Sequence, residues 1–437
     1  MKSARQIAFE ILMKIEKDKA FSNLAIDSAV KAFCQSSTDS AFVSHIVYGV
    51  TERKITLDYV ISMHLDKPIS KLKTDVLVIL RMGCYQLLFS QKVPQSAAVN
   101  ESVNLAKNNK CTFASGMVNA ILRKVNVNDV DFTDIANEDE RVSLECSAPL
   151  ELVKFLKYHY GIDNARRFLL SSLAPKQIFI KVNTTKISTD ALCEKLLSEG
   201  ISSEKTILPN ALKIQLNGAV HDSQCYKDGL FHIEDLSSQL CVEALNAYGG
   251  CTAIDVCAAP GGKSFSIAED MGNEGVLYSC DIYEQRVNLI KQGAERLGLT
   301  CISPCINDAT LFNNDFPQAD RVLCDVLCSG LGIIGKKPEI KYKKLDDTKE
   351  IIPIQKQILE ISSRYVKKGG RLVYSTCSVN PNENRKVCDA FLREHTEFKS
   401  VRVLPHIERT IDEGDYLTLM LHTNKCDGFF IALFERM

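Results

Sequence analysis

The chain has 437 residues, of which 45% are hydrophobic and 24% are charged, with 53 Lys and Arg against 54 Asp and Glu. A single hydrophobic core seldom grows beyond about 250 to 300 residues, so this length predicts more than one domain. The composition is typical of globular proteins. The net charge of −1 excludes a protein that is held to nucleic acid by its overall charge alone.

The first residues run directly into an amphipathic helix pattern and lack the apolar core of a signal peptide. The most apolar early stretch, residues 76–89, is interrupted by Arg81, which argues against a membrane span. The 17 cysteines include no Cys-x-x-Cys pair, and without an export signal they indicate reduced thiols. We therefore expect a cytoplasmic protein with no membrane contact, no disulfide framework and no metal site.

Residues 1–127 have apolar stripes at helical spacing, with Pro68 and Pro94 between stripes, and predict an all-α domain. This part carries 17 Lys and Arg against 10 Asp and Glu, a net of +7, so the other 310 residues carry −8. A basic domain on a mildly acidic body is compatible with RNA binding. An ordinary solvated helical surface is the alternative.

Six acidic residues within 128–141 predict a solvated linker. Residues 142–227 mix helical and strand patterns and predict a small α/β segment, with a strand at 178–183 and a helix at 191–198. From residue 228 to 437, apolar strand candidates alternate with helical stretches at 251–256, 275–281, 301–307, 319–326, 369–376 and 428–434. This alternation predicts a doubly wound, mostly parallel sheet of the Rossmann-like α/β class.

The first of these strands ends at Asp255 and is followed by a turn of small residues, 257–262. Such a turn lets the backbone approach a ligand, and the following helix start offers free N–H groups. A phosphate-binding P-loop is excluded because Cys257 stands where that motif requires glycine. The later strands end near Asp281, Asp308 and Asp325, and a carboxylate after the second strand can bind ribose hydroxyls. The pattern therefore predicts an adenosyl-type cleft.

Two cysteines, Cys328 and Cys377, stand in polar turns directly after predicted buried strands. Open α/β sheets build their ligand clefts at these strand ends. A thiolate that adds to carbon 6 of a pyrimidine turns carbon 5 into a nucleophile able to accept an activated methyl group. The same chemistry needs a proton to leave carbon 5 and a partner for the N3/N4 edge, for which Asp325 is suited. We predict thiolate-assisted methyl transfer.

In these segments the chain resembles the RNA cytosine-5 methyltransferases, with a donor turn at 255–264, a fourth motif at 325–332 and a sixth motif at 374–384. The resemblance implies that Cys377 is the nucleophile, that Cys328 assists product release and that Asp325 joins them in catalysis. It also implies S-adenosylmethionine as the methyl donor, without a metal. The implied donor contacts are Cys257, Ala258, Ala259, Pro260, Gly261, Gly262, Lys263, Asp281, Asp308 and Asp325.

Segments 83–88, 93–94, 98–103 and 118–124 resemble a NusB-type RNA-binding domain. The combination is similar to methyltransferases that act on small-subunit (16S) ribosomal RNA. Since a flipped base needs access, the resemblance and the mechanism together predict RNA that is not yet assembled into the finished subunit. We expect the protein to be a monomer. Two alternatives stay open: a non-catalytic RNA-binding or antitermination-type protein on the same fold, and a transfer-RNA cytosine-5 methyltransferase.

Candidate RNA contacts come from three places in the chain. Residues 335–344 hold five lysines and one tyrosine close behind Cys328, which suits phosphate contacts beside a base taken out of its stack. We predict RNA binding by Lys181, Asn183, Lys336, Lys337, Lys341 and Arg123.

The fourth motif departs from the family, because Leu327 replaces the proline that usually precedes the cysteine. This replacement relaxes the local backbone, and we expect a slower release step.

Overall fold

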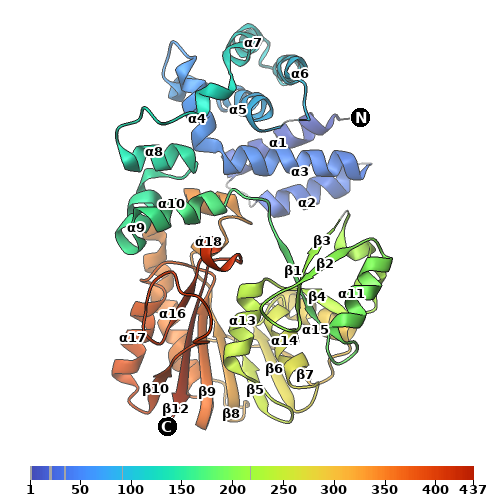
Figure 1. The fold of residues 1–437 in the computed structure, drawn as a ribbon, viewed down its shortest axis with the longest axis vertical. Helices are drawn as coiled ribbons and strands as arrows, with labels where there is room; N and C mark the ends of the chain where they lie inside the picture. Colours follow the sequence, from blue (N-terminus) through green and yellow to red (C-terminus); the bar gives the residue numbers. More distant parts are fainter. Residues whose placement is uncertain (1, 19–21, 34–35, 91, 217) are drawn as a thin grey trace. The chain divides into compact units, whose positions relative to one another are not determined.

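The computed structural model describes the chain except for residues 1, 19–21, 34–35, 91 and 217. It consists of two compact units (Figure 1). The helical unit comprises Met1–Ala174 and Ile334–Lys343, and the sheet unit comprises Pro175–Ile333 and Lys344–Met437. In the described part of the chain, no helix combines the length and the apolar character that crossing a lipid bilayer requires.

Apolar side chains at helical spacing form the core of the helical unit. Its largest fully buried residues include Ile11, Ile46, Leu57, Ile79 and Met82. The α-helices are α1 (Ala4–Asp18), α2 (Ser22–Phe33), α3 (Ser37–Glu52), α4 (Lys54–Met63), α5 (Thr74–Phe89), α6 (Gln95–Asn108), α7 (Ser115–Lys124), α8 (Glu138–Glu145), α9 (Leu150–Tyr160) and α10 (Ile162–Ser171). The all-α prediction for the N-terminal part is confirmed.

The predicted linker at 128–141 is ordered. A 3-10 helix, η3 (Val127–Val130), is closed by a capping box between Asn126 and Asp129. Asp129 is buried and lies 2.8 Å from Nε2 of His64. Asp129 is therefore a buried partner of His64, and the segment is partly helical rather than a simple linker. The other acidic residues are exposed or half-buried, so the prediction that they face solvent is confirmed except at Asp129.

Helices α8 to α10 belong to the helical unit, although the sequence-based division assigns residues 142–174 to the small α/β segment. Thr56 Oγ1 donates to the Leu144 carbonyl at 2.6 Å, and the Ile55 amide donates to Ser147 Oγ at 3.0 Å. These bonds tie the segment after α8 to the start of α4, a long-range pairing that local sequence patterns do not contain.

The sheet unit begins with a four-stranded antiparallel sheet in the order β2-β3-β1-β4. Its strands are β1 (Ile178–Val182), β2 (Ser202–Lys205), β3 (Ala211–Gln215) and β4 (Phe231–Ile233), with helices α11 (Thr189–Ser198) and α12 (Gln224–Lys227). The strand predicted at 178–183 and the helix predicted at 191–198 are confirmed. A small core of Ile180, Leu192, Leu212 and Phe231 holds this sheet together.

The larger sheet has the order β10-β12-β9-β8-β5-β6-β7, with β11 paired to β12. Strands β5 to β9 are parallel, and β10, β11 and β12 are antiparallel additions. The strands are β5 (Thr252–Asp255), β6 (Val276–Asp281), β7 (Ile302–Ile306), β8 (Ala319–Asp325), β9 (Val366–Thr376), β10 (Phe398–Val401), β11 (Leu417–Leu419) and β12 (Phe429–Arg436). The predicted doubly wound, mostly parallel sheet is confirmed.

Helices cover both faces of this sheet. Helices α13 (Leu236–Leu245), α14 (Gly262–Asp270) and α15 (Glu284–Leu297) contribute to one core, and α16 (Thr348–Ser363) and α17 (Arg385–Glu394) to the other. The short α18 (Leu421–Asn424) lies near the C-terminus. Because β5 to β9 are parallel, their carboxyl ends lie at the same edge of the sheet, where α/β proteins place ligands.

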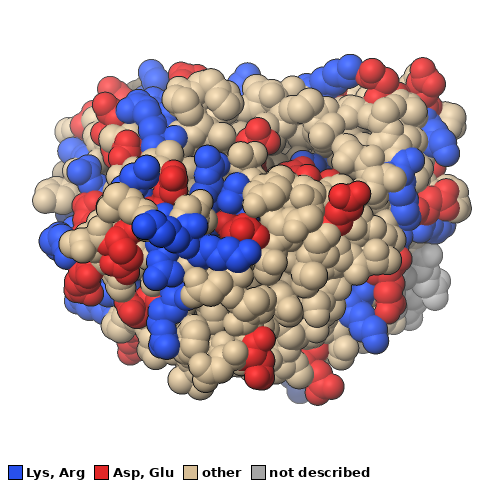
Figure 2. All heavy atoms as spheres, turned by 90° about the horizontal axis from the view of Figure 1, so that it is seen from below, with Lys and Arg blue, Asp and Glu red and all other residues tan. Residues whose placement is uncertain are grey.

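Charged side chains of both signs are distributed over the face shown in Figure 2. Lysine and arginine gather at the left of this view, whereas a broad uncharged area occupies its centre and lower part. This face therefore does not present a field of one sign.

Candidate active site

A tight turn between β5 and α14 forms the first part of the site. Gly261 has a φ of 114°, and a Cβ at this position would lie 2.4 Å from the Phe265 ring. The turn therefore requires glycine. It borders a cavity of about 240 Å³ lined by Ile233, Glu234, Asp235, Ser238, Asp255, Cys257, Ala258, Ala259, Pro260, Gly262, Lys263 and Asp325. Most of the predicted donor-binding turn thus lines one cavity.

Asp325 connects this cavity to the strand that carries the second thiol. Its Oδ2 lies 2.8 Å from Lys263 Nζ, and its Oδ1 accepts a hydrogen bond of 2.7 Å from Ser375 Oγ. Burial opposes the charge of Lys263, but Asp325 more than compensates and raises the lysine pKa. The predicted donor turn and the predicted catalytic aspartate are therefore directly bonded.

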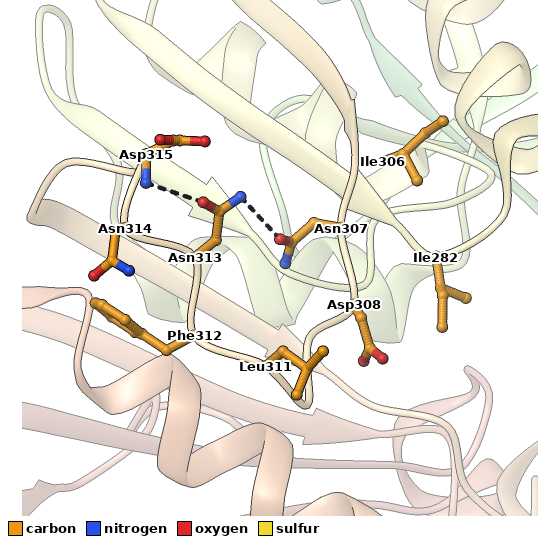
Figure 3. Close-up of a pocket in the computed structure, with 9 residues that line it drawn as sticks. All are labelled: Ile282, Ile306, Asn307, Asp308, Leu311, Phe312, Asn313, Asn314 and Asp315. Carbon is orange, nitrogen blue, oxygen red and sulfur yellow. Dashed lines mark hydrogen bonds between the residues drawn. The ribbon is translucent and has the colours of Figure 1, made fainter.

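A second, more open cavity of about 520 Å³ lies beyond the ends of β6 and β7 (Figure 3). Its lining includes Ile282, Ile306, Asp308 and Leu311. The Asp308 carboxylate accepts bonds from the Thr310 amide at 2.9 Å and from Thr310 Oγ1 at 2.7 Å. This cavity offers apolar side chains next to a carboxylate, which suits a heteroaromatic ring with an exocyclic amine.

Asp281 ends β6 and is nearly buried, with 4% exposure. Its carboxylate lies 3.1 Å from Arg286 Nη1 and accepts a hydrogen bond of 3.2 Å from the Tyr283 amide. Asp281 lines neither of the two cavities described above. Its predicted role as a ribose ligand stays a prediction.

The two thiols predicted to act together lie in contact. Cys328 Sγ is 3.2 Å from Cys377 Sγ, and both side chains are partly exposed. The hydrogen bond to Cys377, followed by burial, raises the pKa of Cys328 well above its usual value. Cys328 therefore keeps its proton at neutral pH and can act as a hydrogen-bond donor to its neighbour.

Glu383 connects the two cysteine-bearing loops by hydrogen bonds. It is fully buried, and its carboxylate accepts bonds from the Ser329 amide at 2.7 Å, from Ser329 Oγ at 2.6 Å and from Ser378 Oγ at 3.1 Å. Gln355 donates to the same carboxylate at 3.3 Å and to the Leu327 carbonyl at 2.9 Å. One side chain thus binds the residue that follows each cysteine.

Two glycines bring a third segment against the thiol loops. The Gly332 amide donates to the Cys377 carbonyl at 3.0 Å, and the Gly428 amide donates to the Gly332 carbonyl at 2.9 Å. A Cβ on Gly332 would lie 1.8 Å from the Gly428 carbonyl oxygen. Only a residue without a side chain fits at this crossing.

Three of the predicted RNA contacts are buried. Lys181 is 6% exposed and lies 3.1 Å from Asp270, while Asn183 donates to the carbonyls of Gly229 and Leu297 at 2.9 and 2.8 Å. Lys341 is 2% exposed and donates to the carbonyls of Glu52 and Ser147 at 2.8 and 2.9 Å. The structure corrects the prediction here, since these side chains have no surface to offer a phosphate.

The other predicted RNA contacts keep accessible side chains. Lys336 and Arg123 are exposed, and Lys337 is partly exposed. Their role in RNA binding stays a prediction. No group of three or more His, Cys, Asp or Glu able to hold a metal ion was found among the described residues.

Sequence reasoning did not assign three residues that the structure places in or beside the site: Glu234, Gln355 and Glu383. Gln355 lies on α16 and reaches the thiol loops only through tertiary packing. Glu234 follows a short apolar strand directly before Asp235, which caps α13. A carboxylate in such a segment is a signal that could have identified it.

The sequence matches three family models. Residues 2–126 match the NusB family, residues 148–221 match the "Methyltr_RsmF/B-like, ferredoxin-like domain", and residues 242–435 match "16S rRNA methyltransferase RsmB/F". These matches cover helices α1 to α7, helices α9 and α10 with strands β1 to β3 of the small sheet, and the large sheet.

Similar proteins extend over the whole chain. The "Probable ribosomal RNA small subunit methyltransferase B" of Bacillus subtilis (strain 168) is 37% identical, with 98% of each chain covered. The protein of the same description from Synechocystis sp. is 33% identical, with 99% of each chain covered. Among solved structures, the crystal structure of PH0851 is similar with a TM-score of 0.82 and 26% identity, over 99% of this chain and 98% of that one.

Proposed function

Because this chain belongs to the family of 16S rRNA methyltransferases RsmB/F and is thus an RNA methyltransferase, we propose that it methylates carbon 5 of a cytosine through a bond between Cys377 and carbon 6. The methyl donor is S-adenosylmethionine, and the substrate is small-subunit ribosomal RNA. The observation that carries this proposal is the contact of Cys328 and Cys377, whose sulfur atoms are 3.2 Å apart.

The donor cavity fits the proposed methyl donor. Gly261 and Gly262 let the backbone approach a ligand, and Asp255 and Glu234 in the cavity lining each keep one buried carboxylate oxygen without a hydrogen-bond partner among the described residues. Acceptors of this kind favour a ligand with N–H or O–H groups. The bound donor supplies the electrophilic methyl group.

The residues of the chain have separate tasks in the proposed reaction. The Cys377 thiolate adds to carbon 6, and the electron pair of the 5,6 double bond becomes available at carbon 5 for the incoming methyl group. Asp325 accepts a hydrogen bond from the N3/N4 edge of the base. After methyl transfer a base removes the carbon 5 proton, the double bond re-forms, and the Cys377 thiolate leaves. Cys328 assists this release.

The target cytosine has to leave its stack to reach two thiols beside a donor cavity. Taking the base out of its stack costs least when the base is not yet paired in the finished subunit. This supports ribosomal RNA that is not fully assembled as the substrate. The exposed Lys336 and Arg123 supply positive charge for contacts with phosphates.

The proposal is tested with labelled S-adenosylmethionine, isolated 16S ribosomal RNA, assembled small subunits and transfer RNA, followed by mapping of 5-methylcytosine. Wild-type protein is expected to label the isolated ribosomal RNA. Cys377→Ala removes the nucleophile and is expected to reduce methylation by at least about 1,000-fold. Cys328→Ala is expected to accumulate a covalent protein–RNA adduct that is visible in a denaturing gel.

Cys324→Ala is the matched control, because this thiol lies on the same strand as Asp325 and is fully buried. It is expected to leave both methylation and adduct formation near wild-type values. Donor binding without methyl incorporation would instead favour the non-catalytic alternative. Methylation of transfer RNA alone would favour the transfer-RNA alternative. Full activity of Cys377→Ala would rule out the covalent mechanism.

A further inference from the structure

Glu234 presents an unused acceptor to the donor cavity. The residue follows β4, directly before the N-cap of α13, and is 5% exposed. Its Oε2 hydrogen-bonds to Ser266 Oγ on α14. Its Oε1 is buried without a hydrogen-bond partner among the described residues, and Glu234 lines the 240 Å³ cavity. A buried acceptor without a partner is unusual, so a ligand atom is the natural candidate to satisfy it.

Asp255 has the same property in the same cavity. It is 1% exposed, and its Oδ2 accepts a bond of 2.7 Å from Ser264 Oγ, whereas its Oδ1 has no partner among the described residues. Lys263, the cation in the lining, is already bonded to Asp325 at 2.8 Å. The lining therefore contains two acceptors, and its one lysine is already paired with Asp325.

These features select the chemical class of the ligand group. A carboxylate would add negative charge to a wall that already contains four carboxyl groups, those of Glu234, Asp235, Asp255 and Asp325. A hydroxyl has a single proton and can satisfy only one acceptor. A primary ammonium carries three N–H donors and a positive charge, so it can donate to more than one acceptor and offset their charge.

We propose that Glu234, together with Asp255, binds the α-ammonium group of the methyl donor. This inference rests on the proposed function, because it presumes that S-adenosylmethionine occupies the cavity. It assigns Glu234 as a donor-binding residue and identifies the amino-acid end of the donor as the part that this cavity receives.

Burial raises the pKa of Glu234 and raises that of Asp255 to about 7. His232 on β4, Lys263 on α14 and Lys181 on β1 act on Glu234 in the opposite direction. A cation placed against the two carboxyl groups favours their ionised forms. Binding of the ammonium group is therefore expected to release protons into solution.

The test uses the full-length protein and two ligands in isothermal titration calorimetry. One ligand is S-adenosylhomocysteine, and the other is the same thioether with hydrogen in place of the α-amino group. Wild-type protein is expected to bind the amino compound about 10- to 100-fold more tightly, the range of a charged hydrogen bond. Glu234→Leu is expected to reduce this preference to less than about 5-fold.

Glu234→Gln keeps a neutral acceptor and is expected to keep a preference of at least about 10-fold. It removes one titrating group, so titrations in two buffers of different ionisation enthalpy should show fewer protons released. Glu269→Leu is the matched control, because Glu269 is 3% exposed, its carboxylate accepts no hydrogen bond from the described residues, and it lies outside this cavity. The control is expected to keep the wild-type preference.

An equal loss of affinity for both ligands in Glu234→Leu would overturn the inference, since it would indicate a purely structural role. Wild-type protein that binds both ligands equally would also overturn it, while leaving donor use intact. Wild-type protein that binds neither ligand would overturn the proposed function itself. If Glu234→Leu does not fold, unchanged proton release in Glu234→Gln would overturn the inference.

Discussion

At the scale of single residues, buried and half-buried ionisable groups determine how this site is held. Glu383 contacts the residue after each cysteine, and Lys263 and Asp325 link the donor turn to β9 through Ser375. Buried charges are retained in proteins when hydrogen bonds satisfy them. Here they connect segments that the proposed reaction needs close together.

Glu383→Gln is expected to slow methyl transfer by about 10- to 100-fold, because the amide cannot accept bonds from Ser329 and Ser378 with both of its terminal atoms. The loss corresponds to one or two charge-assisted hydrogen bonds. Steady-state kinetics should show the effect in kcat, with little change in the KM for the donor. Glu394→Gln, an exposed change at the end of α17, is the control. A wild-type kcat would contradict the positioning role of Glu383.

His232 is expected to weaken the protein at acidic pH. It is 3% exposed, and burial lowers its pKa to about 4, against about 6.5 in the unfolded chain. The unfolded state therefore binds the proton more readily, and stability is lost as pH falls from 6.5 towards 4. The difference of about 2.5 pKa units corresponds to about 3 kcal/mol.

Thermal unfolding of the wild type and of His232→Gln between pH 7.5 and 4.5 tests this expectation. The variant should show a smaller fall in unfolding temperature on the acid side, although it is less stable at neutral pH. Parallel curves for the two proteins would show that His232 titrates normally when folded.

At the scale of elements, short connections outside regular structure assemble the site. Asp255 and Asp325 are the last residues of β5 and β8, and Cys377 directly follows β9. The crossing of Gly332 and Gly428 then joins the loops after β8 and before β12. The segment after this crossing, residues 334–343, belongs to the helical unit. In that unit Lys341 donates hydrogen bonds to the carbonyl of Glu52, the last residue of α3, and to the carbonyl of Ser147, which follows α8.

Lys341→Met is expected to destabilise the helical unit by about 1 to 3 kcal/mol, because two buried carbonyls lose their donor. Differential scanning calorimetry should show this change as a lower unfolding temperature. Lys344→Met, a change of an exposed lysine three residues later, is the control and should have little effect. Equal unfolding temperatures of Lys341→Met and the wild type would contradict a structural role for this lysine.

At the scale of the whole molecule, charge is unevenly divided along the chain. Residues 1–127 carry +7 and the remainder −8, and several of the lysines and arginines of the first part are exposed. Positive charge on one domain can attract a polyanion even when the net charge of the whole protein is close to zero. The NusB family match over residues 2–126 is in keeping with this division.

Arg123→Glu is expected to weaken binding to 16S ribosomal RNA severalfold and to reduce the slope of log affinity against log salt concentration by about one. Arg123 lies exposed in the last turn of α7. Arg393→Glu makes the same charge change at an exposed position on α17 and serves as the control. Filter binding at several salt concentrations measures both. If the slopes of log affinity against log salt concentration were identical for the two variants and the wild type, Arg123 would not contact the RNA.

Much of the architecture follows from local patterns. Helical spacing in the first part, strand and helix alternation after residue 228, and the small-residue turn after Asp255 each depend on neighbours within about ten residues. The structure confirms the fold class predicted from these patterns, and the family matches confirm the resemblance. The catalytic and donor-binding assignments stay predictions, although Cys328 and Cys377 lie in contact and seven predicted donor residues line one cavity.

The sequence by itself determined the succession of elements and the chemical types available at the strand ends. Only the tertiary structure decided which polar side chains remain accessible. Lys181, Asn183 and Lys341 are buried by segments 46 to 289 residues away in the chain. Glu234 lines a cavity whose other walls include the turn after β5 and the end of β8. Burial depends on the packing of distant segments, whereas periodicity is a property of neighbours.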